Sequence, residues 1–341
     1  MDIQLPVLLK TIVAGDTLTE KDAKTACQLI LSGDNPAAAG ALLTLLRQRG
    51  ETVEELSGFL TCLMDYTTPI VTQSVTLDLV GTGGDGHQTI NISTLSALLA
   101  ASMGVRVLKH GNRSVSSACG SADVLEALGL TLERTSAQVA HCVDRVGFGF
   151  CYAPVFNVAL ATVRALRKAL GIPTLFNVMG PLLNPARPAF RLVGVANPDS
   201  AILMADVLAR QSTRKSWVFS GETLALDELS TVTSVRVIEV VDQHIHEPVV
   251  YDFTDYGFRK TTIDELRGGS VAENVALAKA LLQGRGSEAM QTALIINAGV
   301  AAYLYGKADT LPQAFSQAKL ALLEGAPWIL LETLISLQEK Q

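Results

Sequence analysis

One stretch of the chain, residues 77–123, constrains the fold more than any other. It reads LDLVGTGGDGHQTINISTLSALLAASMGVRVLKHGNRSVSSACGSAD. We expect a strand over 75–80, a glycine-rich loop, a helix from 91 to about 103, a strand over 105–108 and a second polar loop. Two strands joined through a helix predict a parallel pair. Both loops then leave the carboxyl ends of neighbouring strands, where open α/β sheets bind ligands.

The residues of these two loops favour a phosphate ligand. Four glycines within residues 81–86 let backbone N–H groups converge on an anion, and the following helix start adds the positive end of its dipole. The second loop adds the cations Lys109 and Arg113 and several serine hydroxyls. Each loop taken alone is equally compatible with a tight turn or a solvated loop.

Two familiar phosphate motifs fit poorly. Gly81, Gly83 and Gly86 formally match GxGxxG, but the helix starts too late and the next strand ends in Lys109 rather than an acidic residue. No Lys-Ser or Lys-Thr pair follows the glycines, as a Walker A motif requires.

Length and charge narrow the class of protein. A chain of 341 residues can bury a large core in about two domains. The net charge of −6 and the pI near 5.4 argue against a general nucleic-acid binder. No run suits a membrane span, the first residues lack the basic segment of a secretory signal, and the five cysteines form no CxxC pair. We therefore expect a cytoplasmic protein with no membrane and no nucleic-acid partner.

Helix signals fill residues 1–66, and strands alternate with helices from residue 74 onward. A capping box at Thr52–Glu55 opens the fourth of the expected N-terminal helices. Further helices are expected over 122–128, 136–146, 157–170, 199–210, 270–282, 286–305, 312–324 and 327–339, and strands over 148–152, 192–195, 216–219 and 235–241. This alternation predicts a mainly parallel sheet covered by helices.

Six sequence blocks resemble, in order, those of the anthranilate phosphoribosyltransferase family, and they span almost the whole chain. They are GTGGD at 81–85, NIST at 91–94, KHGNRSVSS at 109–117, GSADVLEALG at 120–129, FNVMGPLLNP at 176–185 and Asp227-Glu228. The resemblance implies the α/β fold class, with a small all-helical domain over 1–70 plus about 163–184. A larger α/β/α domain of the nucleoside phosphorylase/phosphoribosyltransferase type, with a mainly parallel central sheet, would take 71–162 and 185–341. It also implies a homodimer.

The resemblance implies a reaction as well. The family transfers the phosphoribosyl group of 5-phosphoribosyl 1-diphosphate (PRPP) to the amine of anthranilate and releases diphosphate, in tryptophan biosynthesis. Such a reaction needs a metal, cations and hydrogen-bond donors around the leaving group, and a positioned amine. We expect no discrete catalytic acid or base in the protein.

The donor contacts that the resemblance implies fall on the two loops. For PRPP they are Gly81, Gly84, Asp85, Thr89, Asn91, Ile92, Ser93, Thr94, Lys109, His110, Gly111, Asn112, Arg113, Ser114, Val115, Ser116, Ser117 and Ser121. Asp85, beside an anion, is expected to accept hydrogen bonds from loop N–H groups or from the substrate.

Asp227 and Glu228 are expected to hold Mg²⁺, with the Ser93 hydroxyl as a further contact. Adjacent loop carboxylates suit a hard cation that keeps several waters. Without the resemblance, the carboxylates read as a solvated surface pair and Ser93 as a helix N-cap.

For the acceptor, the resemblance implies Gly81, Asn112 and Arg167. Arg167 would pair with the carboxylate of anthranilate through two N–H bonds. The alternative for Arg167 is an exposed position on a helix, in a RALRK run that also offers Arg164 and Lys168.

The sequence departs from the family at Asn157 and Thr162, where the family has histidines. Asparagine can donate a hydrogen bond but carries no charge near neutral pH. Two alternatives therefore stand beside the main hypothesis: a phosphoribosyltransferase for a different aromatic amine, and a non-catalytic paralogue that binds ligand. The paralogue would need damaged metal or phosphate residues, and the sequence retains them.

Overall fold

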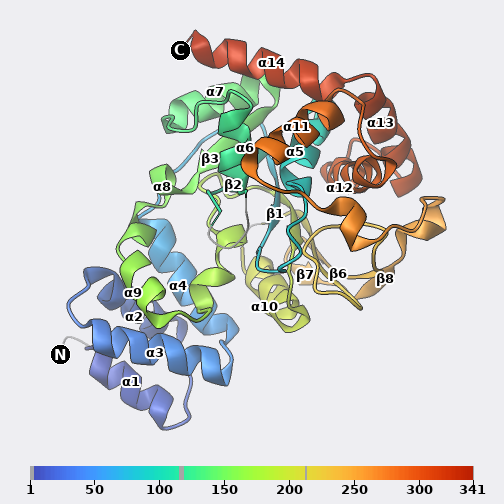
Figure 1. Cartoon of the computed structure of the whole chain (residues 1–341). Coiled ribbons are helices and arrows are strands. Elements are labelled where there is room, and N and C mark those ends of the chain that lie inside the picture. Colours follow the sequence, from blue (N-terminus) through green and yellow to red (C-terminus); the bar gives the residue numbers. More distant parts are fainter. Residues whose placement is uncertain (1–3, 115–118, 212, 341) are drawn as a thin grey trace. The chain divides into compact units, whose positions relative to one another are not determined.

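The computed structural model describes residues 4–114, 119–211 and 213–340, and it divides the chain into two compact units (Figure 1). The helical unit comprises Met1–Pro69 and Ala153–Pro185, and the sheet unit comprises Ile70–Tyr152 and Ala186–Gln341. Val115, Ser116 and Ser117, which were expected to contact PRPP, lie outside the described residues.

The helical unit begins with the four helices that the sequence predicts. They are α1 (Leu5–Val13), α2 (Glu20–Ser32), α3 (Pro36–Arg49) and α4 (Val53–Asp65). The capping box between Thr52 and Glu55 is present at the start of α4. Helices α2 and α4 approach so closely that a Cβ on Gly58 would collide with the carbonyl oxygen of Glu20.

The second part of the helical unit differs from the expected single helix over 157–170. It contains α8 (Ala153–Phe156), a 3-10 turn at Val158–Ala161, α9 (Arg164–Leu170), and 3-10 turns at Leu175–Asn177 and Gly180–Leu182. Asn157 separates α8 from the first 3-10 turn, because its backbone lies outside the helical region (φ −112°, ψ 55°), and α9 begins only at Arg164. The Asn157 side-chain amide donates to Thr67 Oγ1 at 3.0 Å and to the Leu183 carbonyl at 3.1 Å. These bonds tie residues 153–162 to the helical unit, so the expected boundary near 163 is too late.

The sheet unit contains an eight-stranded sheet in the order β3-β2-β1-β4-β5-β6-β7, with β8 also paired to β6. The strands are β1 (Leu77–Gly81), β2 (Val107–Gly111), β3 (Phe148–Tyr152), β4 (Phe190–Gly194), β5 (Lys215–Gly221), β6 (Val235–Val241), β7 (His244–Ile245) and β8 (Val249–Tyr251). Neighbouring strands from β3 to β5 are parallel, and the pairs of β6 are antiparallel. The prediction of a mainly parallel sheet is confirmed.

Helices cover the sheet on two faces. They are α5 (Ile92–Ser102), α6 (Ser121–Ala127), α7 (Ser136–Val146), α10 (Pro198–Ala209), α11 (Val271–Leu282), α12 (Glu288–Tyr305), α13 (Leu311–Leu323) and α14 (Ala326–Glu339), with 3-10 turns at Phe253–Tyr256 and Ile263–Leu266. The connections β1–α5–β2 and β4–α10–β5 run in opposite directions along the sheet. Right-handed crossovers therefore place α5 and α10 on opposite faces (Figure 1). The strand order reverses between β1 and β4, which is where such sheets bind ligands.

The strand β2 is longer at its carboxyl end than expected. Lys109, His110 and Gly111 belong to β2 and pair in register with Phe150, Cys151 and Tyr152 of β3, rather than starting a loop. Lys109 and His110 are buried. These polar residues do not mark a loop, because the Lys109 amine donates to the Leu79 carbonyl and the His110 N–H donates to Asp78 inside the sheet unit.

Within the described part of the chain, no helix alone has the length and apolar character of a membrane span. Helices α13 and α14 meet that test only together, as a pair bent by 65°.

Candidate active site

The glycine-rich loop after β1 closes around Asp227, which lies in the connection between β5 and β6. The Gly83 N–H donates to Asp227 Oδ2 at 2.6 Å. A Cβ on Gly81 would collide with the same carboxylate, and a Cβ on Gly194, at the end of β4, would collide with the Asp227 carbonyl. Glycine is therefore required at both strand ends, and Asp227 lies where the strand order reverses.

Glu228 joins the same site to the start of α5. Its Oε1 accepts a hydrogen bond from the Ser93 N–H at 3.1 Å. The Ser93 hydroxyl accepts from Lys109 Nζ at 3.2 Å, and Lys109 also donates to the Leu79 carbonyl at 2.5 Å. The N-cap position of α5 belongs to Asn91, so the alternative of Ser93 as N-cap is wrong.

These buried charges shift one another's pKa values. Burial, and then the charge of Asp85, raise the pKa of Asp227 to about 7. Burial, and then the charge of Asp227, raise the pKa of Glu228 to about 8. Burial lowers the pKa of Lys109, against the opposing pull of Asp78 and of the two acids. The site gathers more carboxylates than cations.

This excess of negative charge fits a divalent cation. Among the described residues, no group of three or more His, Cys, Asp or Glu side chains forms a metal site of its own. Asp227 and Glu228 supply hard oxygen ligands, and Mg²⁺ is commonly held by one or two carboxylates together with waters and substrate phosphates. The donor set therefore suits a magnesium ion that binds together with a phosphorylated substrate.

The remainder of the first loop is fixed by hydrogen bonds to its surroundings. Asp85 Oδ1 accepts from the His87 N–H at 3.2 Å, as expected for a carboxylate that accepts from the loop. Thr89 pairs with Arg267 in an isolated bridge. Asn91 Nδ2 donates to the Cys119 carbonyl at 3.0 Å, which joins the exit of the first loop to the second loop. The two loops therefore lie side by side.

Ile92 and Thr94, which were also expected to contact PRPP, have buried side chains in the first turn of α5. Gly84, another expected contact, has a positive φ of 81°. Gly111 ends β2 where a Cβ would collide with Ser121 Oγ. The His110 N–H donates to Asp78 Oδ1 at 3.2 Å. Most of these residues therefore shape the backbone of the site.

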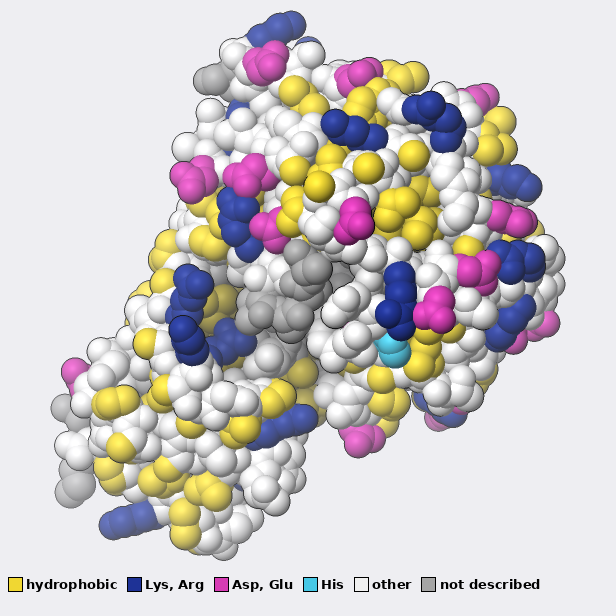
Figure 2. All heavy atoms as spheres, viewed as in Figure 1, with side chains coloured by type: hydrophobic (Ala, Val, Ile, Leu, Met, Phe, Trp, Pro, Cys, Tyr) yellow, Lys and Arg dark blue, Asp and Glu magenta, His cyan; other side chains and the backbone are white. Residues whose placement is uncertain are grey.

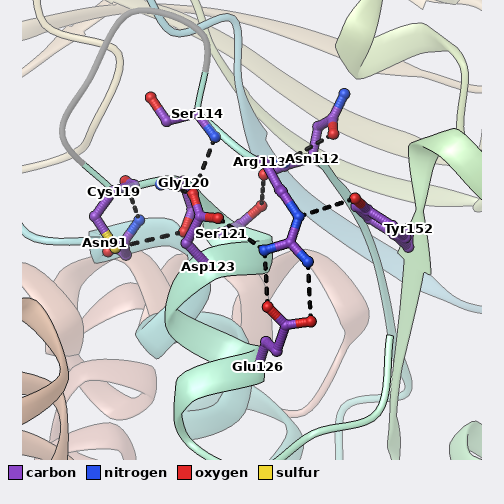
Figure 3. A network of polar contacts seen from close by, with 10 residues as sticks. All are labelled: Asn91, Asn112, Arg113, Ser114, Cys119, Gly120, Ser121, Asp123, Glu126 and Tyr152. Atoms are coloured by element: carbon purple, nitrogen blue, oxygen red, sulfur yellow. Dashed lines mark hydrogen bonds and ion pairs between the residues drawn. The ribbon is translucent and has the colours of Figure 1, made fainter. Parts of the chain in front are cut away.

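The second loop directs its arginine toward α6 (Figure 3). The Arg113 guanidinium binds both oxygens of Glu126 at 2.8 and 2.9 Å, Asp123 Oδ1 at 3.1 Å and the Tyr152 hydroxyl at 3.1 Å. Asn112 is exposed, and its carbonyl accepts from Ser121 Oγ at 3.2 Å. Arg113 was expected as a phosphate contact, and here two carboxylates hold its charge.

Asp123 and Glu126 were missed as functional candidates, although both lie in the block GSADVLEALG. The available signal was local: Asp123 is the third residue of α6, where a carboxylate can accept from the N–H of the N-cap residue, as it does from Gly120 at 2.9 Å. An acid in the first turn of a helix is usually interpreted as structural, so nothing in the sequence tied it to the loop.

In the helical unit, Arg167 is distinguished from its basic neighbours by burial. Arg164 and Lys168 are exposed, whereas Arg167 is half-buried and burial lowers its pKa. Its guanidinium lies 5.7 Å from the centre of the Phe176 ring, and Nη2 donates to Asn177 Oδ1 at 3.5 Å. A planar cation held against an aromatic ring is suited to a flat carboxylate ligand.

The two positions that depart from the family have different surroundings. Asn157 is buried and fully engaged with Thr67 and Leu183, whereas Thr162 is exposed and donates only to the Ala159 carbonyl among the bonds described. Asn157 therefore serves the packing of the helical unit, whereas the described bond of the Thr162 hydroxyl stays within its own turn.

Surface charge gives no sign of a nucleic-acid track on the face shown in Figure 2. Basic and acidic side chains are interspersed over the visible face of the sheet unit, in keeping with the net charge of −6.

Comparisons with known proteins agree with this geometry. The family model described as "Glycosyl transferase family, helical bundle domain" matches residues 6–67, and the one described as "Glycosyl transferase family, a/b domain" matches residues 73–327. The anthranilate phosphoribosyltransferase of Chlamydia felis is 39% identical over 337 residues, which cover 98% of this chain and 97% of the relative.

Solved structures show the same fold. The crystal structure of anthranilate phosphoribosyltransferase from Thermus thermophilus matches with a TM-score of 0.90 and 35% identity, covering 99% of this chain and 100% of that chain. The Saccharomyces cerevisiae enzyme in complex with PRPP and Mg matches with a TM-score of 0.90 at 24% identity, covering 99% and 98%. The chain thus belongs to the anthranilate phosphoribosyltransferase family.

Proposed function

We propose that this chain transfers the phosphoribosyl group of PRPP to the amine of anthranilate, giving N-(5-phosphoribosyl)anthranilate and diphosphate, in tryptophan biosynthesis. One observation carries the proposal: Asp227 and Glu228 are held between the glycine-rich loop, the start of α5 and Lys109 at the switch point of the sheet. Family membership supplies the identity of the substrates.

On this proposal, the first loop and α5 bind the diphosphate. The glycine-rich backbone of the loop suits an anion, which supports contacts at Gly81, Gly84 and Thr89, and the start of α5 places residues 91–94 beside that loop. Asp227, Glu228 and the Ser93 hydroxyl would hold magnesium, which when bound neutralises the diphosphate leaving group. Lys109 holds the Ser93 hydroxyl and offsets the negative charge of the two acids.

The second loop would bind the phosphoribosyl group and meet the acceptor. The exposed amide of Asn112, the Ser121 hydroxyl and the backbone around Gly111 support this assignment. Arg167 would pair with the acceptor carboxylate, as its half-buried guanidinium supports. No acid or base is assigned, because positioning and leaving-group stabilisation carry the reaction.

The test is a turnover assay. The protein, magnesium, PRPP and anthranilate are incubated together, and consumption of anthranilate is followed by the loss of its fluorescence. We expect consumption that depends on both PRPP and magnesium. Absence of turnover at every substrate concentration would reject the proposal.

A second candidate is a phosphoribosyltransferase for a different aromatic amine. It is favoured by Asn157 and Thr162, which replace histidines of the family, while the residues expected to bind PRPP are retained. A panel of substituted anthranilates and other aromatic amines decides between the two. The second candidate is rejected if anthranilate has the highest kcat/KM.

We further propose that the enzyme is a cytoplasmic homodimer. The resemblance supports the dimer, and each of the five cysteines lies within the described residues without a disulfide, which supports a reducing compartment. Light scattering of the purified protein tests the dimer, with a monomeric mass as the contrary result.

A further inference from the structure

We propose that Asp123 is a positioning residue for PRPP and that Arg113 acts through it rather than as a direct phosphate ligand. Asp123 would fix the two flanks of the second loop, which we define as residues 111–114 and 119–121. This inference rests on the proposed function, because it concerns the binding of the same donor.

The first observation is that one carboxylate joins both flanks (Figure 3). Asp123 Oδ2 accepts from the Ser114 N–H at 3.1 Å and from the Gly120 N–H at 2.9 Å, and Oδ1 accepts from Arg113 at 3.1 Å. The Asp123 side chain is 18% exposed, and its two bonds to backbone N–H groups are partly buried, whereas its bond to Arg113 is exposed. A carboxylate that accepts several N–H bonds is a strong cross-link between the segments that donate them.

The second observation is the close approach of the flanks. A Cβ on Gly120 would collide with the backbone N of Ser114, and a Cβ on Gly111 would collide with Ser121 Oγ. The Asn112 carbonyl accepts from the Ala122 N–H at 3.2 Å as well as from Ser121. The flanks therefore touch through their backbones, and the Asp123 carboxylate accepts from both of them.

The third observation concerns Arg113. Its guanidinium has five N–H donors, and four hydrogen bonds run from it to Asp123, Glu126 and Tyr152. Two carboxylates offset its single charge, and the bidentate bond to Glu126 must break before a phosphate can take the same fork. Arg113 is better placed to neutralise Asp123 and to fasten the loop to α6 and β3.

The network also reaches the first loop. Asn91, at the start of α5, donates to the Cys119 carbonyl on the second flank. A substitution at Asp123 is therefore expected to affect the first loop, where PRPP would bind. Asp227 and Glu228, which would hold magnesium, make no hydrogen bond to Asp123 in the described part of the chain. Loosening the flanks should weaken PRPP binding and leave the chemical step nearly unchanged.

The experiment compares Asp123→Asn, Glu126→Gln and Arg113→Lys by steady-state kinetics and by calorimetric binding of PRPP with magnesium. We expect Asp123→Asn to raise the KM for PRPP about tenfold with kcat within about twofold. Glu126→Gln should raise that KM about threefold, because Arg113 loses an anchor. Combining Asp123→Asn with Arg113→Lys should add little to the effect of Asp123→Asn alone.

The sign of the Glu126→Gln effect separates the two roles of Arg113. If Arg113 binds phosphate directly, releasing it from Glu126 should leave the KM for PRPP unchanged or lower it, and that result overturns the proposal. An unchanged KM in Asp123→Asn overturns it as well. Should Asp123→Asn fail to fold, as judged by its thermal transition, Glu126→Gln alone decides.

Glu222→Gln is the matched control, because Glu222 also binds an arginine, Arg236, through both oxygens on the surface of the sheet unit. It should change neither KM nor kcat, and a KM increase equal to that of Glu126→Gln would overturn the proposal. If the unmodified protein shows no turnover with any acceptor, the proposed function fails. The PRPP binding constants of Asp123→Asn and the unmodified protein still test the present inference.

Discussion

The tripeptide Asp-Glu-Leu occurs twice in the sheet unit, with opposite consequences. At 227–229 both acids are buried, and their pKa values are raised to about 7 and about 8. At 264–266 Asp264 is 74% exposed, and both acids form surface ion pairs with Arg267 and Arg259. The hydrogen bond from Arg259 holds the pKa of Glu265 at about 2.

The difference lies in what surrounds each tripeptide. Two glycines, Gly81 and Gly194, let the backbone close over Asp227, and Lys109 provides one buried cation nearby. The second tripeptide follows a capping threonine at the start of a 3-10 turn and meets solvent. The same two acids therefore form a candidate cation site at 227–228 and cap a 3-10 turn at 264–265. The difference is set by the surrounding backbone, which closes over the first pair and leaves the second pair in solvent.

Neutralising the acids of each tripeptide in turn should give the largest difference in activity between the two sites. Asp227→Asn with Glu228→Gln should lower kcat/KM roughly a hundredfold or more, because the ligands proposed for magnesium lose their charge. The measurements are kcat/KM and PRPP binding by calorimetry, both over a magnesium series. Asp264→Asn with Glu265→Gln is the matched control and should leave both unchanged. Equal losses in both variants would contradict the assignment.

Filling the space over Asp227 should have the next largest effect. Gly81→Ala places a Cβ against the carboxylate, so we expect roughly a 30-fold loss in kcat/KM and about 1–3 kcal/mol of destabilisation. Gly40→Ala in α3 adds a Cβ 3.3 Å from a flexible Leu170 methyl. It should be neutral or stabilise by up to about 1 kcal/mol, since alanine favours the helix. Urea unfolding together with kinetics compares the two, and full activity in Gly81→Ala would refute the close approach.

A substitution outside both tripeptides should affect the KM of one substrate and not that of the other. Arg167→Ala should raise the KM for anthranilate about tenfold and leave the KM for PRPP nearly unchanged, because a charge-assisted pair with the acceptor is lost. Arg164→Ala, at an exposed position of the same helix, should change neither. A rise in both KM values would remove Arg167 from its proposed role.

The smallest expected effect concerns stability against pH in the absence of magnesium. A carboxyl whose pKa is raised in the folded state costs stability as the pH rises above its unfolded value, until the folded pKa is passed. The ligand-free protein in chelator should therefore lose thermal stability between about pH 5 and pH 8. Asp227→Asn with Glu228→Gln should melt about 3 °C higher than the unmodified protein at pH 8.

The same comparison for Glu265 has the opposite sign. Its lowered pKa contributes stability above its unfolded value, which is lost only as the pH falls toward 2. Neutralising 264–265 removes that contribution, so the melting temperature should fall slightly, and by the same amount at every pH between 5 and 8. Calorimetric scans at several pH values check both statements, and a parallel response of the two variants would contradict them.

The sequence predicted those features that local signals encode. The glycine loop, the adjacent parallel strands and the four N-terminal helices depend on turn residues, caps and periodicity within a few residues. The contact of Asp227 with Gly83 spans 144 positions of the chain, and no local signal distinguishes 227–229 from 264–266. Only the resemblance pointed to the first of them.

Other errors share a tertiary cause. Lys109 looked like the start of a polar loop, but it is a strand residue whose amine is paired inside the unit. Residues 157–170 have the composition of a helix, yet Asn157 is bonded to Thr67 and Leu183, a 3-10 turn follows it, and α9 begins only at Arg164. In Arg113, a cation expected to be open to ligand is held by acids 10 and 13 positions further along. Each case required knowledge of the partner.

The order in which the ribosome makes this chain has a consequence for the helical unit. Its first part ends at Pro69, but its second part, which carries the partners of Thr67, runs to Pro185. At about 5–20 residues per second, roughly 6–23 s pass before the second part has been synthesised. During that interval the nascent N-terminal helices lack the part of their packing surface that residues 153–185 later supply.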